Sequence, residues 1–247
     1  MKLIKVKGIV LKEVQYNDND KILTVFTDEL GKVSCMAKGA KKTNSSLLAP
    51  CQFLVYSEFV LYKGTSFYHI NSAEIIDTFY NLRIDYDKLE TAYSITKVLM
   101  QAICEAEEAK EALSLFLNTM FVIENKQMPS KFVEAIFKLK LISLLGYMPN
   151  IVTCSVCGKQ VINSESKEYF YSFANNNIIC GACYEEEMKS AIGSHKVSYV
   201  KLSQAVYFAC VYVITSTTKK VFNFNLDNTC IDEFSKYVDM LFSVIMV

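Results

Sequence analysis

The sequence predicts an α+β protein, in which a five-stranded barrel is followed by a helical domain with an inserted four-cysteine zinc knuckle. Short segments with alternating or β-branched residues fill residues 2–79, and helical periodicity takes over from residue 80. Two Cys-x-x-Cys pairs then lie between residues 154 and 183. The expected domains are 1–80 for the barrel, 81–150 and 185–247 for the two parts of the helical domain, and 151–184 for the insertion.

Five strands are expected in the N-terminal domain, at residues 2–14, 21–27, 32–38, 52–62 and 66–77. Polar turn-forming stretches separate several of them, at 16–20, 28–31 and 63–65. Closing such a sheet into a small barrel removes its exposed edges, and five strands are typical of the OB-fold. An SH3-like barrel fits the same pattern.

The helical domain is predicted from apolar residues that recur at helical spacing over 89–103, 112–123 and 132–144. Pro129 suits the start of the third helix, and Gly146 suits its C-terminal cap. Further helices are expected at 184–192, at 199–214 and from about residue 229 to the end. These stripes indicate a packed core and no cofactor site.

The four cysteines Cys154, Cys157, Cys180 and Cys183 predict one structural zinc site. Each Cys-x-x-Cys turn supplies two thiolates, and Gly158 and Gly181 permit the positive φ that a metal knuckle often needs. Four thiolates leave no coordination position for a catalytic water, and the two histidines, His69 and His195, lie far away in sequence. Cysteines without metal and a redox centre are the alternatives.

The composition gives further bounds on function. The net charge is zero, but residues 1–42 hold nine lysines against five acidic residues, so any basic surface is N-terminal. Five other cysteines, at 35, 51, 104, 210 and 230, are expected to be buried in a reducing cytosol. No signal peptide, membrane span, phosphate loop or nucleophile elbow is recognisable. We therefore expect a cytoplasmic binding protein with no small-molecule substrate, and not an enzyme.

Two segments carry a family resemblance. Residues 7–46 run as strand, polar turn, strand ending in Phe-Thr, Glu-Leu-Gly-Lys turn, strand and Ala-Lys-Gly-Ala-Lys-Lys, which resembles the OB domain of the RecO family. Residues 141–159 resemble that family's helix ending in Leu-Gly and its first zinc knuckle, and residues 178–185 resemble its second. This chain departs from the family's usual arginine-rich stretch, because Arg83 is its only arginine.

The resemblance implies a non-enzymatic mediator of recombinational repair in the bacterial cytoplasm, associated with the nucleoid. Such a protein binds single- and double-stranded DNA, anneals complementary strands, and works with RecR to help RecA load. It also contacts the C-terminal tail of the single-stranded-DNA-binding protein. An interaction scaffold with little direct DNA contact is the alternative.

OB-folds bind strands through the face of strands two and three and through the loops L12 and L45. Here L12 (residues 16–20) is acidic and is expected to repel phosphate, whereas L45 (residues 62–66) offers a tyrosine and a lysine. The residues expected to contact DNA are Lys5, Lys7, Lys38, Lys41, Lys42, Tyr62 and Lys63.

Overall fold

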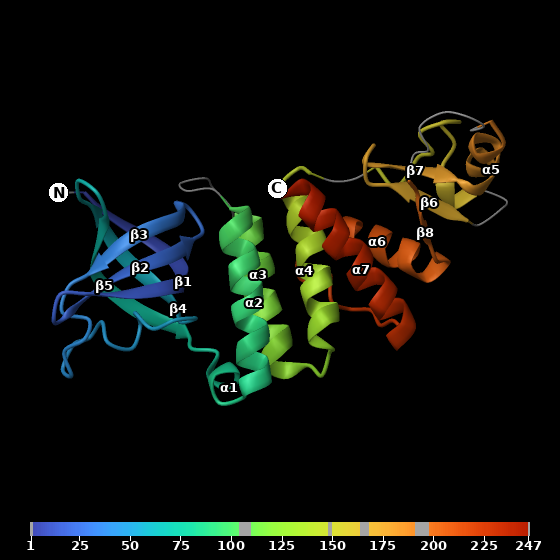
Figure 1. Cartoon of the computed structure of the whole chain (residues 1–247). Helices are drawn as coiled ribbons and strands as arrows, with labels where there is room; N and C mark the ends of the chain where they lie inside the picture. The colour runs from blue at the N-terminus through green and yellow to red at the C-terminus, as the bar shows by residue number, and fades with distance from the viewer. Residues whose placement is uncertain (1, 104–109, 148–149, 164–167, 191–197, 247) are drawn as a thin grey trace. The chain divides into compact units, whose positions relative to one another are not determined.

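The computed structural model describes residues 2–103, 110–147, 150–163, 168–190 and 198–246 (Figure 1). They belong to two compact units, residues 1–127 and residues 128–247. The first unit holds a barrel and the helices α1 to α3, and the second holds α4 to α7 with a small sheet. This division falls inside the predicted segment 81–150, and the predicted domain boundaries stay predictions.

The barrel consists of β1 (Leu3–Tyr16), β2 (Asp20–Thr27), β3 (Gly31–Ala37), β4 (Tyr56–Lys63) and β5 (Tyr68–Asp77). The strands pair in the order β1-β2-β3-β5-β4, and β4 pairs back to β1 to close the sheet. β3 and β5 run parallel, and the other neighbours run antiparallel. This confirms the OB-fold and excludes the SH3-like alternative.

The stretch before β4 differs from the prediction. The fourth strand begins at Tyr56 and not at residue 52, because residues 52–54 form a turn in which Leu54 has a φ of 61°. The whole segment from residue 38 to residue 55 contains no strand, and Ala40, Leu47 and Cys51 pack into the barrel core. Leu54 and Val55, which suggest a strand in the sequence, are buried although they lie before the strand begins.

Three helices follow in the first unit: α1 (Tyr80–Arg83), α2 (Tyr86–Ala102) and α3 (Lys110–Asn125). Asp85 caps α2 by accepting hydrogen bonds from the backbone N–H groups of Asp87 and Lys88. The predicted apolar stripes of α2 and α3 are buried, including Ala92, Ile95 and Leu99.

Arg83, the single arginine, is used to hold the barrel to this helical part. Its Nε donates to the carbonyl of Thr78 at 3.2 Å, Nη1 donates to Oε1 of Gln52 at 3.0 Å, and Nη2 donates to the carbonyl of Phe53. The guanidinium fork thus ties the turn before β4 to the start of α1. Arg83 has a structural role and is not an exposed phosphate ligand.

The second unit pairs long helices with a three-stranded sheet. The helices are α4 (Ser130–Leu144), α5 (Gly181–Ser190), α6 (Gln204–Thr215) and α7 (Asn228–Ile245), with a short 3-10 helix at Val161–Asn163. β6 (Tyr169–Ser172) lies between β7 (Asn177–Cys180) and β8 (Val200–Leu202). Pro129 precedes α4, and Gly146 follows it with a φ of 83°, as the sequence predicted.

One predicted helix begins later than expected. Residues 200–202 form β8, and α6 begins at Gln204, where Ser203 accepts a hydrogen bond from the N–H of Val206. Of the five cysteines predicted to be buried, Cys35, Cys51 and Cys210 are buried and Cys230 is half-exposed. Cys104 and His195 lie outside the described residues.

Among the described residues, no helix is long and apolar enough to cross a membrane.

Replacing Arg83 by alanine should lower the free energy of unfolding by about 2 kcal/mol. The substitution removes a charged donor, and its three acceptors lose their hydrogen bonds. Urea unfolding measures this change, with the exposed Lys2→Ala variant as the control. An Arg83→Lys variant should recover only part of the loss, since an ammonium cannot reproduce the planar fork. Equal unfolding free energies for the Arg83→Ala variant and the parent chain would contradict the assigned role.

Candidate nucleic-acid interface and metal centre

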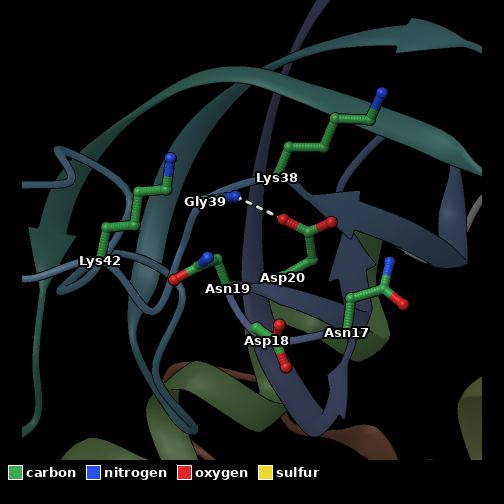
Figure 2. Close-up of a pocket in the computed structure, with 7 residues that line it drawn as sticks. All are labelled: Asn17, Asp18, Asn19, Asp20, Lys38, Gly39 and Lys42. Carbon is green, nitrogen blue, oxygen red and sulfur yellow. Dashed lines mark hydrogen bonds between the residues drawn. The ribbon is translucent and has the colours of Figure 1, made fainter.

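One end of the barrel gathers L12 and the lysine-rich segment after β3 around an open pocket. The pocket has a volume of about 440 Å³ (Figure 2). Its lining residues are Asn17, Asp18, Asn19, Asp20, Lys38, Gly39 and Lys42. The structure therefore brings the predicted Lys38 and Lys42 together on one side of a single hollow.

L12 holds this lysine segment in place. Oδ1 of Asp20 accepts a hydrogen bond from the N–H of Gly39 at 2.8 Å, and the carbonyl of Asn19 accepts one from the N–H of Lys41 at 3.0 Å. Gly39 has a φ of 68°, which glycine adopts without steric strain. The Asp20 carboxylate thus acts partly as a support for the segment that carries the lysines.

The lysine side chains of this segment differ in availability. Lys41 Nζ donates to Oε1 of Gln15 at 3.3 Å. Lys38 and Lys42 are exposed, make no ion pair within the described residues, and extend away from Asp18 (Figure 2). Asp18 and Asp20 line the same pocket, so their charges oppose the attraction of the two ammonium groups for an anion.

Lys5 and Lys7 lie on the outer surface of β1, away from the barrel core. The Nζ of Lys5 pairs with Oε1 of Glu58 on β4 at 2.6 Å, and this pairing raises the pKa of Lys5 above its ordinary value. Lys7 stands directly opposite Glu58 in the strand register. A carboxylate therefore offsets part of the charge of this predicted pair.

Tyr62 and Lys63 lie at the end of β4, where L45 begins. The Tyr62 ring stacks on the His69 ring of β5, with ring centres 4.9 Å apart and planes 13° apart. Lys63 is exposed and makes no ion pair within the described residues. His69, which the sequence suggested to be an ordinary structural residue, is thus part of the L45 end of the barrel.

Part of the face formed by strands two and three is covered by the chain itself. Phe26 on β2 is fully buried although its neighbour Val25 fills the barrel core, so Phe26 packs on the outside. Lys32 stands opposite Phe26 on β3, and its Nζ donates to the carbonyls of Met100 and Ile103 at the end of α2. The end of this face far from L12 and L45 is therefore covered in part by other segments of the first unit.

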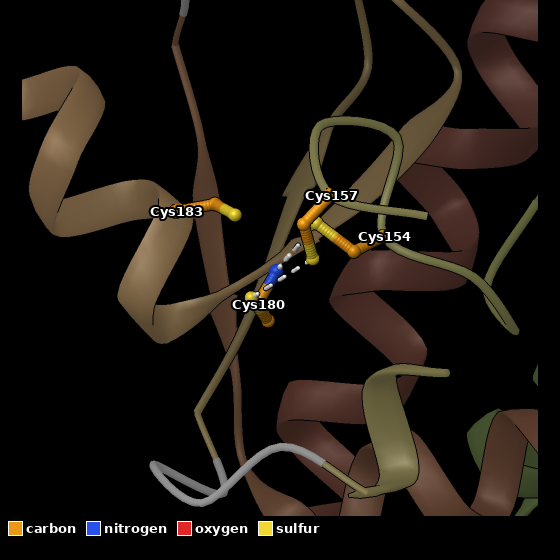
Figure 3. Close-up of side chains that lie close together, drawn as sticks. All are labelled: Cys154, Cys157, Cys180 and Cys183. Carbon is orange, nitrogen blue, oxygen red and sulfur yellow. Dashed lines mark hydrogen bonds between the residues drawn. The ribbon is translucent and has the colours of Figure 1, made fainter. Parts of the chain in front are cut away.

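The four predicted metal ligands converge in the second unit. The sulfur atoms of Cys154, Cys157, Cys180 and Cys183 all lie within 4.8 Å of one another (Figure 3). The sulfur atoms of Cys157 and Cys180 are 4.0 Å apart. A tetrahedral thiolate site with bonds of about 2.3 Å has sulfur atoms about 3.8 Å apart. The cluster can therefore hold a metal ion without a large rearrangement.

The first pair sits in a tight turn that is fixed by backbone hydrogen bonds. The N–H of Gly158 donates to the carbonyl of Cys154 at 2.9 Å, and Gly158 has a φ of 70°. The N–H of Cys154 donates to the carbonyl of Lys159 at 2.9 Å, and Ser155 donates to Ile178 of β7 at 3.0 Å. The predicted role of Gly158 in the knuckle is confirmed.

The second pair spans the end of β7 and the start of α5. Cys180 is the last residue of β7, and Cys183 lies in the first turn of α5. Gly181 begins the helix and is not among the glycines with a positive φ, so its predicted conformation is wrong. The strand-to-helix junction supplies the second knuckle instead.

The surroundings favour ionisation of one thiol and oppose that of another. Burial acts to raise the pKa of Cys154, but N–H donation from the backbone of Cys157 and Cys180 outweighs it and lowers the pKa to about 7. The N–H of Cys180 reaches Sγ of Cys154 at 3.4 Å. Burial raises the pKa of Cys183, and hydrogen bonding with the neighbouring thiols raises it further. A bound cation would favour ionisation of all four thiols.

Aromatic contacts connect this cluster to the helices of its unit. Tyr169 of β6 stacks on Tyr207 of α6, with ring centres 4.1 Å apart and planes 4° apart. Tyr171 contacts Tyr237 of α7 edge to face at 5.2 Å. The strand that pairs with the Cys180 strand is thus packed against both helices. No histidine joins the cluster among the residues that the structure describes.

Sequence reasoning missed the contacts of Lys32 and His69 in the first unit. Lys32 looks like any surface lysine in a strand, and its helix-end partners lie 68 and 71 positions away. The contact of His69 with Tyr62 depends on the pairing of β4 with β5. The alternation of side chains in both strands places these two rings on one face, and this alternation could have predicted their contact.

Comparisons with known proteins agree with this arrangement. The family model "Recombination protein O N terminal" matches residues 1–79, and "Recombination protein O C terminal" matches residues 83–201. A protein named DNA repair protein RecO from Acetivibrio thermocellus is 33% identical over 96% of this chain and 89% of its own length. Proteins of the same name from Clostridium novyi and Clostridium acetobutylicum are 29% and 32% identical over 98% and 94% of this chain. The chain, with its closed OB barrel and its four-cysteine cluster, belongs to the RecO family of DNA repair proteins.

Proposed function

We propose that this protein is a non-enzymatic mediator of recombinational repair that binds single- and double-stranded DNA and anneals complementary strands. The observation that carries the proposal is the open end of the barrel, where Lys38, Lys42 and Lys63 are exposed and make no ion pair within the described residues. Unpaired lysines beside OB loops attract the phosphates of a nucleic-acid backbone. The proposed place of work is the bacterial cytoplasm at the nucleoid.

The same proposal includes the partners that the family resemblance implies. The protein would act with RecR to help RecA load on single-stranded DNA, and it would contact the C-terminal tail of the single-stranded-DNA-binding protein. Membership of the RecO family supports these contacts, because the curated relatives are named DNA repair proteins.

An interaction scaffold is the second candidate, and one observation favours it. The second unit carries an open apolar groove of about 550 Å³ beside α6. It is lined by Ala205, Phe208, Ala209, Val211, Tyr212, Thr215, Phe224 and Leu226. A partner could bury apolar side chains here with no contribution from the barrel lysines.

The cysteine cluster is proposed to hold one structural zinc ion. Zinc prefers four soft thiolate ligands in a tetrahedron, and the donor set and spacing of Cys154, Cys157, Cys180 and Cys183 fit this geometry. When bound, the ion supplies positive charge that lets all four thiols ionise, and it cross-links the first knuckle to β7 and α5. Four protein ligands leave no position for a reactive water, which supports a role without catalysis.

The combined variant Lys38→Ala, Lys42→Ala, Lys63→Ala should weaken binding to a single-stranded oligonucleotide. Removing three phosphate contacts should make the slope of log K against log salt shallower by about 2. Fluorescence anisotropy over a salt series measures this slope. The matched control, Lys110→Ala, Lys189→Ala, Lys236→Ala, changes the net charge equally at exposed positions elsewhere and should retain the parent slope.

Two outcomes of this series would redirect the proposal. Undetectable binding of the parent chain in low salt would remove direct DNA binding as the function. Binding that is equal in both triple variants would favour the scaffold.

The Cys180→Ser variant should lose the bound metal, because three thiolates and a hydroxyl hold zinc far more weakly than four thiolates. Elemental analysis should find about one zinc ion per parent chain and none in the variant. Cys230→Ser, a half-exposed cysteine outside the cluster, should keep its zinc. The visible spectrum of a cobalt-substituted sample should show tetrahedral sulfur coordination. A spectrum with bound water would instead require an open site and reopen the question of catalysis.

A further inference from the structure

A row of outward-facing side chains crosses the barrel at the end that carries L12 and L45. Register places Tyr62 of β4 directly opposite both Leu3 of β1 and His69 of β5. His69 is in turn opposite Met36 of β3, and Met36 is opposite Ile22 of β2. Directly opposed residues share one face of a sheet and contact one another. The row is apolar or aromatic throughout, and Leu3 is 55% exposed although it is a large hydrophobic residue.

The aromatic centre of this row is held rigidly by L45. The Tyr62 and His69 rings stack within 13° of parallel. Gly64 fits closely against His69, because a Cβ at this position would lie 2.7 Å from Cδ2 and Nε2 of the ring and 2.7 Å from the carbonyl of Phe67. The N–H of Gly64 donates to that carbonyl at 2.9 Å, which closes the loop. Any side chain at residue 64 must therefore displace either the ring or the loop.

The Nδ1 atom of His69 is buried and has no hydrogen-bond partner within the described residues. His69 therefore contributes the shape of its ring and its stacking on Tyr62, and no hydrogen bond through Nδ1. A phenylalanine at this position would keep an aromatic ring of similar width and would sacrifice no hydrogen bond made by Nδ1. The contact with Tyr62 is thus the part of His69 that matters for the surface.

Positive charge lies close to the aromatic pair at the ends of two strands. Lys63 follows Tyr62 as the last residue of β4, and Lys38 is the residue directly after β3 ends at Ala37. Both are exposed and make no ion pair within the described residues. Tyr62 and His69 are each partly exposed, and exposed aromatic rings beside free cations suit contact with the planar bases of a strand on a phosphate backbone. A duplex hides the faces of its bases by stacking, so it cannot use the aromatic surface.

We propose that Tyr62 and His69, held by Gly64, form a base-stacking platform that gives this protein a preference for single-stranded DNA. Lys38 and Lys63 bind the phosphates on either side of the stacked base. This inference rests on the proposed DNA-binding function and adds a strand preference and three residues that determine it.

The test compares three 20-nucleotide ligands of the same length in low salt: a single strand, a single strand with abasic sites, and a duplex. Tyr62→Ala and His69→Ala should each weaken binding of the single strand about tenfold, with little effect on the duplex or the abasic strand. His69→Phe should bind like the parent chain, and Gly64→Ala should behave like His69→Ala. Tyr86→Ala, a 77% exposed tyrosine on α2, is the control and should change nothing.

Each outcome has a distinct meaning. Thermal unfolding midpoints within about 2 °C of the parent would show that the variants remain folded, and His69→Phe provides the test at residue 69 if the alanine variant unfolds. If the parent chain binds none of the ligands, the proposed function fails and this inference falls with it. If it binds normal and abasic strands equally, or if Tyr62→Ala binds the single strand like the parent, the platform is refuted and DNA binding stands.

Discussion

The parallel pairing of β3 with β5 is the constraint on which the rest of the first unit depends. The other strand pairs can form as antiparallel neighbours, but the sheet closes only when Met36 meets His69 and Cys35 meets Tyr68. That register fixes which loops share an end of the barrel. L12, L45 and the lysine segment after β3 come together because β3 ends beside the start of β5 and beside β2. The proposed DNA surface is therefore a consequence of barrel closure and not of any single loop.

Several lysines are unavailable for DNA because they stabilise the ends of helices. Lys32 donates to the last carbonyls of α2, Lys88 donates to the carbonyl of Glu124 near the end of α3, and Lys140 donates to the carbonyl of Ile214 near the end of α6. The carbonyls of a last helical turn lack partners within the helix and carry partial negative charge, so an ammonium group is favourable there. The net charge of the chain is zero, but its lysines have different roles. Some stabilise helix ends, and others remain free of ion pairs at the open end of the barrel within the described residues.

The sequence predicted the parts of this protein that depend on local patterns. Alternating residues predicted the five strands, and the Cys-x-x-Cys spacing predicted the four residues that converge. The sequence-based prediction failed where one pattern of apolar residues is compatible with two kinds of structure. The apolar residues at 52–55 suit a strand, but Leu54 and Val55 are buried in the stretch before β4 begins, and residues 200–202 suit a helix until they pair with β6. The closed half of the strand face could not be predicted, because the contact of Lys32 with α2 joins residues about 70 positions apart in sequence.

The charge of the cysteine cluster explains why its surroundings are built from backbone N–H groups and aromatic rings. With the proposed dication bound, four thiolates would leave two negative charges in a largely buried site, and burial of charge is costly unless donors face it. N–H donation to Cys154 and the N-terminal end of α5 beside Cys183 both place positive partial charge toward sulfur. Tyr169 and Tyr171 then attach the adjoining strand to α6 and α7 through ring contacts that need no further charge. The proposed ion would therefore help to order a segment whose short strands are too small to fold by apolar burial alone, and the ring contacts join that segment to the helices.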